Sequence, residues 1–254
     1  MAKALSQIKE AFKSLSTLEE YKGFYDEYIQ DERAGVKNIA LSAMKKHDAL
    51  QKEILRIQEM KKYELENESL GLLCGIDEVG RGPLAGPVYA AAVILPKDSD
   101  ILYLNDSKKL SEKKREELYD VIMEKAVAVG IGYSTCERID EINILQATYE
   151  AMKKAVDSLS VKPGALLIDA VHVPQLESYK QISIIKGDAK SVSIAAASIV
   201  AKVTRDRVMK ELALKYPEYG FESNKGYGSA EHIAALKKYG PCEIHRRSFI
   251  GNFV

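Results

Sequence analysis

The 254-residue sequence has no excess of charge of either sign, no long hydrophobic segment and few cysteines. Its 37 Lys and Arg residues balance its 37 Asp and Glu residues, so any nucleic-acid binding would require a local basic cluster. The longest apolar run, Val88 to Leu95, is too short to span a bilayer. The charged start, MAKALSQIKE, is unlike a signal peptide. Three widely spaced cysteines, Cys74, Cys136 and Cys242, argue against a disulfide framework and for a reducing compartment. We therefore expect a cytoplasmic globular protein.

The first seventy residues contain no proline and only two glycines, Gly23 and Gly35, whereas the rest of the chain holds all seven prolines. Such a composition, with frequent Ala, Leu, Glu and Lys, favours helices. Twelve basic and thirteen acidic residues balance here, so the region is no basic arm. We predict a helical region over residues 1–70, joined at about Glu66–Gly71 to a second domain over residues 71–254. A stabilising cap or a substrate-handling appendage explains it better than a separate enzyme.

From Leu72 onward, short apolar runs alternate with helical patterns. The apolar runs have the length and composition of strands and predict five of them, at 72–79, 88–95, 126–133, 165–168 and 181–185. Helices are predicted around residues 142–159, with Asp140 as the N-cap, over 191–215 and over 229–239. Interleaved strands and helices indicate an α/β fold. Because a short link joins the first two strands, we expect a mixed sheet rather than a purely parallel one.

Four carboxylates lie where predicted strands end or a helix begins. Asp77 and Glu78 close the first strand, Asp169 closes the fourth, and Asp188 precedes the long helix. Strand ends and helix starts of α/β sheets gather at one edge, so we expect these side chains to lie together. Neighbouring strand residues point to opposite faces, so Asp77 and Glu78 can share a site only if the strand bends there. Taken singly, each acid has the alternative of being a helix cap or a turn residue.

Four carboxylates lying close together would repel one another unless their negative charge is neutralised. Two unit charges about 4 Å apart repel by roughly 4 kcal/mol at an effective dielectric near 20. Either some of the acids are protonated or cations neutralise them. Ligands that are all oxygen favour a hard ion, Mg²⁺ or Mn²⁺, over zinc. A pair of such ions suits phosphodiester hydrolysis, because one ion activates water and the other stabilises the leaving oxygen.

The segment GRGPLAG, Gly80–Gly86, permits a rival hypothesis. It is close to the dinucleotide-binding fingerprint and so suggests a dinucleotide-dependent enzyme. The fingerprint requires a helix after its glycines, but here VYAAAVIL follows, which predicts a strand. We instead expect Gly80, Arg81 and Gly82 to bring main-chain amides and a guanidinium against a phosphate or a ribose. A third hypothesis is a nucleic-acid-binding module without catalytic activity.

Cys242 and His245 have the spacing of half a zinc site. A closed zinc site needs four ligands, and the other Cys and His residues supply no matching second half. We therefore predict no structural zinc.

Five motifs, in order along the chain, resemble the signatures of bacterial ribonuclease HII. They are GIDEVGRGPLAGPV from Gly75, DSKKLS from Asp106, KGDAKSVSIAAASIVAKVTRD from Lys186, NKGYGSAEH from Asn224 and YGPCEIHRRSF from Tyr239. The resemblance covers Gly71 to the C-terminus and leaves out the first seventy residues. Ribonuclease HIII has a lysine in the middle of the glycine motif, so Arg81 points to the HII type. The resemblance implies a ribonuclease H-like fold, a mixed β-sheet flanked by helices, here with a helical N-terminal extension.

The resemblance also implies an activity. It is the endonucleolytic hydrolysis of RNA in RNA–DNA hybrids and incision 5′ of ribonucleotides embedded in duplex DNA, leaving 3′-hydroxyl and 5′-phosphate ends. Asp77, Glu78, Asp169 and Asp188 would be the catalytic and metal-binding acids. The cofactor would be a divalent metal, Mn²⁺ or Mg²⁺, with two ions in the active complex. The partner would be nucleic acid, and we expect a monomer that does not bind membranes.

The same resemblance names the substrate contacts. Gly80, Arg81 and Gly82 would sense the ribose 2′-hydroxyl, and Tyr227 would pack on the sugar. Tyr227 lies between two glycines, which favours an exposed ring over the alternative of a core tyrosine. Lys202 and Arg205 lie three residues apart on one helical face, as phosphate contacts or as structural ion-pair residues. Local positive charge is expected from basic residues inside the motifs: Lys108, Lys109, Lys202, Arg205, Lys225, Arg246 and Arg247.

Overall fold

A computed structural model of the protein describes residues 3–254. The chain divides into two compact units, one up to Glu59 and one from Met60 to Val254. Residues 60–70, which the composition groups with the helical region, fall in the second unit. Between residues 3 and 254, no helix is both long enough and apolar enough to cross a membrane.

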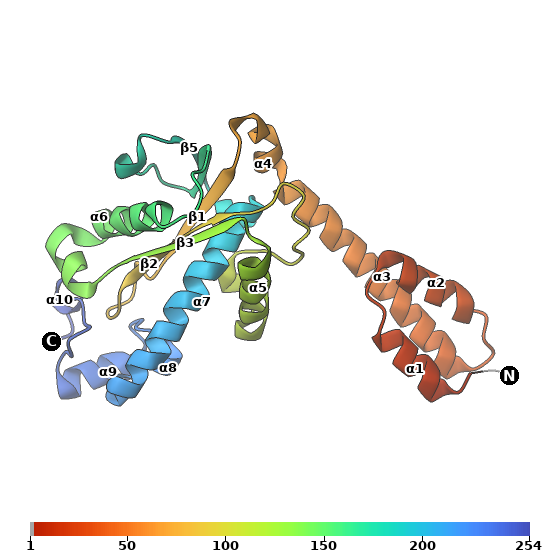
Figure 1. Cartoon of the computed structure of the whole chain (residues 1–254). Coiled ribbons are helices and arrows are strands. Elements are labelled where there is room, and N and C mark those ends of the chain that lie inside the picture. The colour runs from red at the N-terminus through yellow and green to blue at the C-terminus, as the bar shows by residue number, and fades with distance from the viewer. Residues whose placement is uncertain (1–2) are drawn as a thin grey trace. The chain divides into compact units, whose positions relative to one another are not determined.

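The first unit is helical, as predicted. Its helices are α1 (Leu5–Lys13), α2 (Leu18–Tyr28) and α3 (Ala34–Met60), and α1 and α2 lie alongside α3 (Figure 1). A capping box begins α2, because the Thr17 hydroxyl accepts the N–H of Glu20 while the Glu20 carboxylate accepts the N–H of Thr17. The unit has a hydrophobic core of its own, formed by Ile8, Tyr21, Phe24, Tyr28, Val36, Ala40 and Ala43.

The second unit is built on a mixed five-stranded sheet. Its strands are β1 (Leu73–Val79), β2 (Val88–Ile94), β3 (Ala128–Ser134), β4 (Ala165–Asp169) and β5 (Lys180–Ile184), in the order β3-β2-β1-β4-β5. The β1–β2 and β2–β3 pairs are antiparallel, whereas β1–β4 and β4–β5 are parallel. The five predicted strands and the mixed sheet are therefore confirmed. The parallel pairing brings the carboxyl ends of β1 and β4 side by side.

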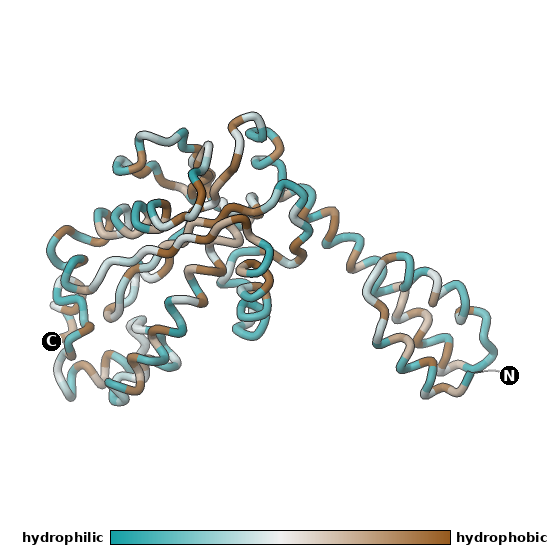
Figure 2. Tube along the Cα trace, in the orientation of Figure 1, coloured by the Kyte–Doolittle hydropathy of each residue, from teal (hydrophilic) through white to brown (hydrophobic). Residues whose placement is uncertain are grey.

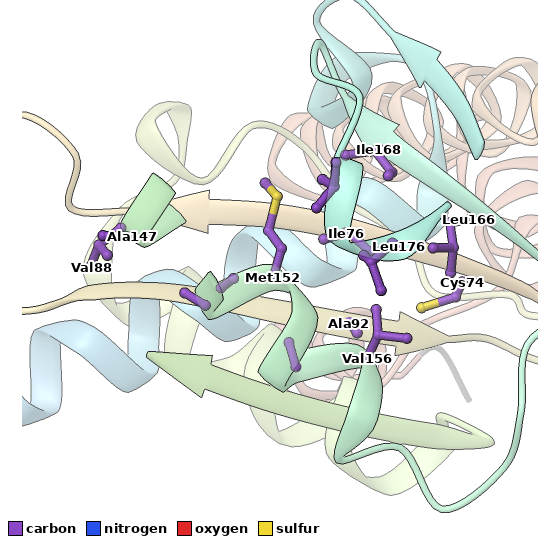
Figure 3. Close-up of a cluster of buried hydrophobic side chains, with 14 of the residues drawn as sticks. Cys74, Ile76, Val88, Ala92, Ala147, Met152, Val156, Leu166, Ile168 and Leu176 are labelled. Atoms are coloured by element: carbon purple, nitrogen blue, oxygen red, sulfur yellow. The ribbon is translucent and has the colours of Figure 1, made fainter. Parts of the chain in front are cut away.

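Two long helices cover the opposite faces of this sheet (Figure 1). Helix α6 (Cys136–Asp157) packs on the face that includes Ile76, where a large hydrophobic core lies (Figure 3). Helix α7 (Val192–Lys215) packs on the other face, against β1 and β2. A Cβ atom on Gly75 would lie 2.0 Å from the carbonyl carbon of Ser193, so only glycine allows strand and helix to approach this closely. Hydrophobic residues accordingly follow the strands of the sheet (Figure 2).

Short helices and 3₁₀ turns complete the second unit. Before β1 lie α4 (Lys62–Glu66) and η1 (Glu68–Leu70), and after β2 lie η2 (Ser107–Lys109) and α5 (Glu112–Lys125). The turns η3 (Pro174–Leu176) and η4 (Gly187–Ala189) precede and follow β5. The elements that follow α7 are η5 (Pro217–Tyr219), α8 (Phe221–Asn224), α9 (Ala230–Tyr239) and α10 (Arg247–Ile250).

Helix α4 is attached to the start of α7 by one carboxylate. Glu64 accepts hydrogen bonds from the Ser191 hydroxyl (2.6 Å) and from the Ser193 N–H (3.0 Å). Ser191 is the N-cap residue of α7 and Ser193 lies in its first turn, where free N–H groups favour a negative charge. Glu64 is therefore an N-terminal cap supplied from a distant part of the sequence.

The prediction of Asp140 as a helix N-cap is wrong. Asp140 lies inside α6, which begins one turn earlier with a side-chain cap at Thr135. The helix is interrupted at Asn143, whose φ of 67° lies in the left-handed region. Asp140 accepts instead the N–H groups of Arg247 (2.7 Å) and Ser248 (2.9 Å), at the start of α10. Its carboxylate thus ties α6 to the C-terminal segment.

Candidate functional site

The four predicted carboxylates lie on neighbouring elements at one edge of the sheet, which we call the acidic edge. Parallel pairing of Ile76 with Ile168 places Asp77 and Asp169, the next residues, at adjacent strand ends. Glu78 follows Asp77 on β1, and Asp188 lies in η4, between β5 and α7. Asp77 is only 6% exposed. The edge is therefore built from secondary-structure elements rather than from a long loop.

Burial and mutual repulsion raise the pKa of three of these acids. Burial is the largest cause for Asp77, whose pKa lies well above its usual range, and the charges of Glu78 and Asp169 add to it. Burial likewise raises the pKa of Glu78, and Asp169 raises it further. The pKa of Asp188 is raised by burial and then by the charges of Asp106 and Asp169. Asp169 therefore repels all three of the other acids. The carboxylates of the acidic edge destabilise one another when they are ionised together.

The bend expected inside β1 is absent. The strand pairs regularly with β2 through Val79, and the chain turns only at Gly80, where φ is 88°. Asp77 and Glu78 therefore point to opposite faces of the strand. The expected condition of a bend is nevertheless not needed for the two acids to contribute to one site, because Asp169, at the end of the neighbouring strand, raises the pKa of both.

Two main-chain amides orient the carboxylates. Asp77 accepts the N–H of Glu78 (2.7 Å), and Asp169 accepts the N–H of Gly187 (2.7 Å). Each of these bonds uses one carboxylate oxygen. The N–H of Gly187 also connects the end of β4 to η4, the turn that carries Asp188.

The chemistry of this donor set fits a hard divalent cation. All candidate ligands are carboxylate oxygens, and the nearby positive charges of Arg81 and Lys108 only partly offset them. In the described part of the chain, no three Asp, Glu, His or Cys side chains are already arranged around one point as metal ligands. The residues therefore fit an ion by charge and donor type, and binding one requires the side chains to turn toward it.

The segment after β1, residues 80–87, lies beside Tyr227; we call it the glycine loop. A Cβ atom on Gly82 would lie 3.8 Å from Cε1 of the Tyr227 ring. Arg81 and Gly82 are exposed, and Tyr227 is 43% exposed, so Tyr227 is not a core tyrosine. Arg81 also forms an ion pair of 3.4 Å with Glu78, which connects the glycine loop to the acidic edge.

The basic residues fall into two groups. Lys108 is exposed and its charge lowers the pKa of both Glu78 and Asp188, which places it beside the acidic edge. Lys202 forms an ion pair of 2.7 Å with Asp206 and is mostly buried. Of the two predicted roles, phosphate contact and structural ion pair, the structure favours the ion pair. Arg205 and Arg246 are completely buried, so the expectation that they belong to a basic surface is wrong. Their partners are main-chain carbonyl groups.

Asp106 and Ser198 are not among the predicted site residues, although both contact the acidic edge. Asp106 raises the pKa of Asp188 by its charge and by a side-chain hydrogen bond. The Ser198 hydroxyl, 3.0 Å from that of Ser107, forms a hydrogen bond that lowers the pKa of Asp77. Both residues lie inside the motifs that resemble ribonuclease HII, and this position was the feature of the sequence that could have pointed to them.

The dinucleotide hypothesis requires a helix after Gly86. The structure has the strand β2 there, beginning at Val88. The hypothesis of a dinucleotide-dependent enzyme is therefore wrong, because the helix that the fingerprint requires is absent at this place.

Comparison with known proteins identifies the family. The family model described as Ribonuclease HII matches residues 74–252, and that of the Ribonuclease HII N-terminal domain matches residues 4–68. Ribonuclease HII of Lachnoclostridium phytofermentans is 58% identical over 248 residues, covering 97% of each chain, and that of Clostridioides difficile is 49% identical over 254 residues, covering 99% of each. The crystal structure of ribonuclease H2 from Pyrococcus horikoshii OT3 matches with a TM-score of 0.58 and 31% identity, over 69% of this chain and 92% of that one. The chain therefore belongs to the ribonuclease HII family.

Proposed function

We propose that this chain is an endonuclease that hydrolyses RNA in RNA–DNA hybrids and incises duplex DNA on the 5′ side of embedded ribonucleotides. The products carry 3′-hydroxyl and 5′-phosphate ends, and the reaction depends on a divalent metal ion. The observation that best supports this function is the electrostatic coupling of four carboxylates at one sheet edge, next to the exposed glycine loop.

In this proposal Asp77, Glu78, Asp169 and Asp188 hold two ions, Mg²⁺ or Mn²⁺. When bound, such ions activate a water molecule and stabilise the leaving 3′-oxygen. The protein's contribution is a crowded set of negative charges, whose repulsion a cation relieves. The N–H groups of Glu78 and Gly187 each bind one carboxylate oxygen, of Asp77 and Asp169 respectively, and so orient these two carboxylates.

The glycine loop and Tyr227 would recognise the ribose. The 2′-hydroxyl is the group that separates a ribonucleotide from its DNA neighbours. Gly82 carries no side chain, so its backbone can approach the sugar closely, and the exposed Tyr227 ring lies beside it. Lys108 supplies a positive charge for a phosphate next to Glu78 and Asp188.

We assign the chemistry to residues 71–254. In this proposal the helical region over residues 1–70 handles substrate or stabilises the protein, and the active form is a monomer. The residues of the acidic edge and the glycine loop all come from the second unit.

The test is cleavage of a duplex that carries one ribonucleotide, with Mg²⁺, with Mn²⁺ and after chelation. A nick on the 5′ side of that residue is expected with a metal ion and not after chelation. Asp169→Asn keeps an oxygen that accepts the Gly187 N–H but loses a charge, so the fold is retained. Its rate should fall at least about 100-fold, because a catalytic metal contributes several kcal/mol.

The matched control is Asp157→Asn, which removes an exposed carboxylate of α6 that pairs with Lys153. This variant should cleave like the wild type. Absence of cleavage by the wild-type chain with either ion would overturn the function. An Asp169→Asn variant with the wild-type rate would overturn the assignment of the acidic edge.

A further inference from the structure

Two arginine side chains lie buried behind the glycine loop. Arg205 and Arg246 are both 0% exposed. Within residues 3–254, neither guanidinium lies in an ion pair with an acidic side chain, and burial lowers the pKa of both. A buried charge is costly unless hydrogen bonds satisfy it. The two arginines must therefore be held by the groups to which they donate.

Those groups belong mainly to one short turn of the chain. Arg246 donates to the carbonyl oxygens of Gly80 (2.5 Å), Arg81 (2.8 Å) and Gly86 (2.7 and 2.9 Å). Arg205 donates to those of Ala85 (3.2 Å) and Pro87 (2.9 Å). Together the two guanidinium groups bind five carbonyl groups of the glycine loop.

Arg205 also connects this loop to the segment that carries Tyr227. Its Nη1 donates to the carbonyl oxygen of Lys225, at 2.9 Å. The carbonyl oxygen of Gly226 accepts the N–H of Leu84, at 2.8 Å. The loop and the tyrosine segment are thus held together from behind, on the side away from solvent.

The inward carbonyl groups fix the direction of the outward amides. In a trans peptide the C=O of one residue and the N–H of the next point in opposite directions. Because Arg246 binds the carbonyls of Gly80 and Arg81, the N–H groups of Arg81 and Gly82 point away from it. Both residues are exposed, and across the described chain neither of these N–H groups donates a hydrogen bond. They are available donors, and Gly82 lies beside the Tyr227 ring.

The fit between loop and arginine is close. Gly80 has a φ of 88°, and a Cβ atom there would lie 2.3 Å from Nε of Arg205. The loop therefore rests directly on the side chain of Arg205. Two positive charges behind the loop also strengthen the hydrogen bonds that its outward N–H groups can donate to an oxygen atom.

We propose that Arg205 and Arg246 are positioning residues that aim the amides of Arg81 and Gly82 at the ribose 2′-hydroxyl. The inference rests on the proposed function and explains how the enzyme would select a ribonucleotide over a deoxyribonucleotide. The arginines do not touch the substrate. They set the discrimination between a ribonucleotide and a deoxyribonucleotide by holding the turn in one conformation.

The experiment compares the full chain with its Arg246→Met and Arg246→Lys variants. Methionine retains much of the stem but no donor, and lysine retains the charge without the planar fork that binds several carbonyls. The control is Arg138→Met, which removes an exposed guanidinium of α6 that pairs with Glu141 and Glu150. Affinity is measured without divalent metal for two duplexes that differ only by one 2′-hydroxyl. Amide hydrogen exchange of residues 80–87 is followed in parallel.

The wild type and the control should bind the ribonucleotide duplex more tightly than the DNA duplex. Arg246→Met and Arg246→Lys should lose about five- to tenfold of that preference, the effect of about one hydrogen bond, and should keep their affinity for the DNA duplex. Exchange should increase in residues 80–87 and remain unchanged in the sheet. If Arg246→Met does not fold, Arg246→Lys carries the test.

A folded variant with the wild-type preference and unchanged exchange in residues 80–87 would overturn the proposal. So would equal losses of affinity for both duplexes, which a merely structural role predicts. If the wild type itself shows no preference and no cleavage, the proposed function fails. The exchange of residues 80–87 in the variants then still decides whether Arg246 holds the turn.

Discussion

His232 and His245 face each other through their Nε2 atoms, which lie 3.0 Å apart in the interior of the second unit. Nδ1 of His232 lies 2.8 Å from the carbonyl oxygen of Tyr227, to which it must donate. Its Nε2 then accepts a hydrogen bond from the Nε2–H of His245, while Nδ1 of His245 accepts the N–H of Cys242 at 3.0 Å. All four ring nitrogens are satisfied only when both rings are neutral.

This arrangement predicts a loss of stability in mild acid. Burial lowers the pKa of both histidines, and that of His245 falls to about 4. A lowered folded-state pKa means that the stabilisation is complete above about pH 6.5, the unfolded value, and is lost as the pH falls toward 4. Between pH 7.5 and pH 5, His245 alone should cost about 2 kcal/mol of unfolding free energy.

The measurement is urea unfolding of the wild type and of His245→Asn at the two pH values. Asparagine has an oxygen that can accept the Cys242 N–H but cannot be protonated in this range. The difference in stability between the two proteins should therefore change by about 2 kcal/mol with pH. His172→Gln, which alters an exposed histidine, is the control and should keep the wild-type pH dependence. A pH-independent difference for His245→Asn would contradict the prediction.

Removing the charge of Asp169 should stabilise the protein in the absence of metal. Asp169 raises the pKa of Asp77, Glu78 and Asp188, so its charge repels theirs in the folded state. In EDTA at about pH 8, Asp169→Asn should gain about 1 kcal/mol of unfolding free energy. Added Mg²⁺ should stabilise the wild type by mass action and should stabilise the variant much less. Thermal unfolding with and without Mg²⁺ measures both effects, and a less stable variant in EDTA would refute the prediction.

Tyr227→Ala should impair cleavage at an isolated ribonucleotide. The exposed ring lies beside Gly82, where a sugar can pack on it. By analogy with stacking of bases on aromatic side chains, its loss should cost about 1–3 kcal/mol in kcat/KM. Tyr227→Phe keeps the ring and should stay close to the wild type. Tyr239→Ala, at another exposed tyrosine, serves as the control. Equal rates for Tyr227→Ala and the wild type would reject the packing role.

The contact of Glu64 with the first turn of α7 predicts where the chain can be shortened. A chain that begins at Met60 keeps this cap, whereas one that begins at Gly71 loses it. The shorter chain should be less stable by about 1 kcal/mol or more, as for other lost helix caps. Glu64→Ala in the full chain should reproduce a similar loss. Equal unfolding free energies for the two shortened chains would show that the cap contributes nothing.

The sheet was predictable because its signal is local. Buried strands such as β2 are continuous apolar runs, and Gly and Pro residues mark their ends. The grouping of the acids was predictable for the same reason, since each follows such a run. The failed prediction at Asp140 has the opposite cause. Its partners are the N–H groups of Arg247 and Ser248, more than a hundred positions away in the sequence.

The positions of two basic residues were also predicted wrongly, because their partners are distant in the sequence. A run of basic residues within a motif suggests a surface that binds phosphate, and Lys108 fits this expectation. Arg205 and Arg246 have the same charge but lie in the interior, because carbonyl groups of the glycine loop replace water around them. No spacing rule connects residue 246 with residue 80, so only the folded chain reveals this pairing.

The close packing of α7 on Gly75 also fixes the positions of Ser198 and Arg205, two other residues of this helix. The helix backbone rests on the strand two residues before Asp77, where a methyl group would have no room. Lifting α7 at this point would carry Ser198 away from Asp77 and would withdraw Arg205 from the turn it supports. The chemistry proposed for the acidic edge and the ribose recognition proposed for the glycine loop therefore both depend on the absence of a side chain at Gly75, and a substitution there would disturb both.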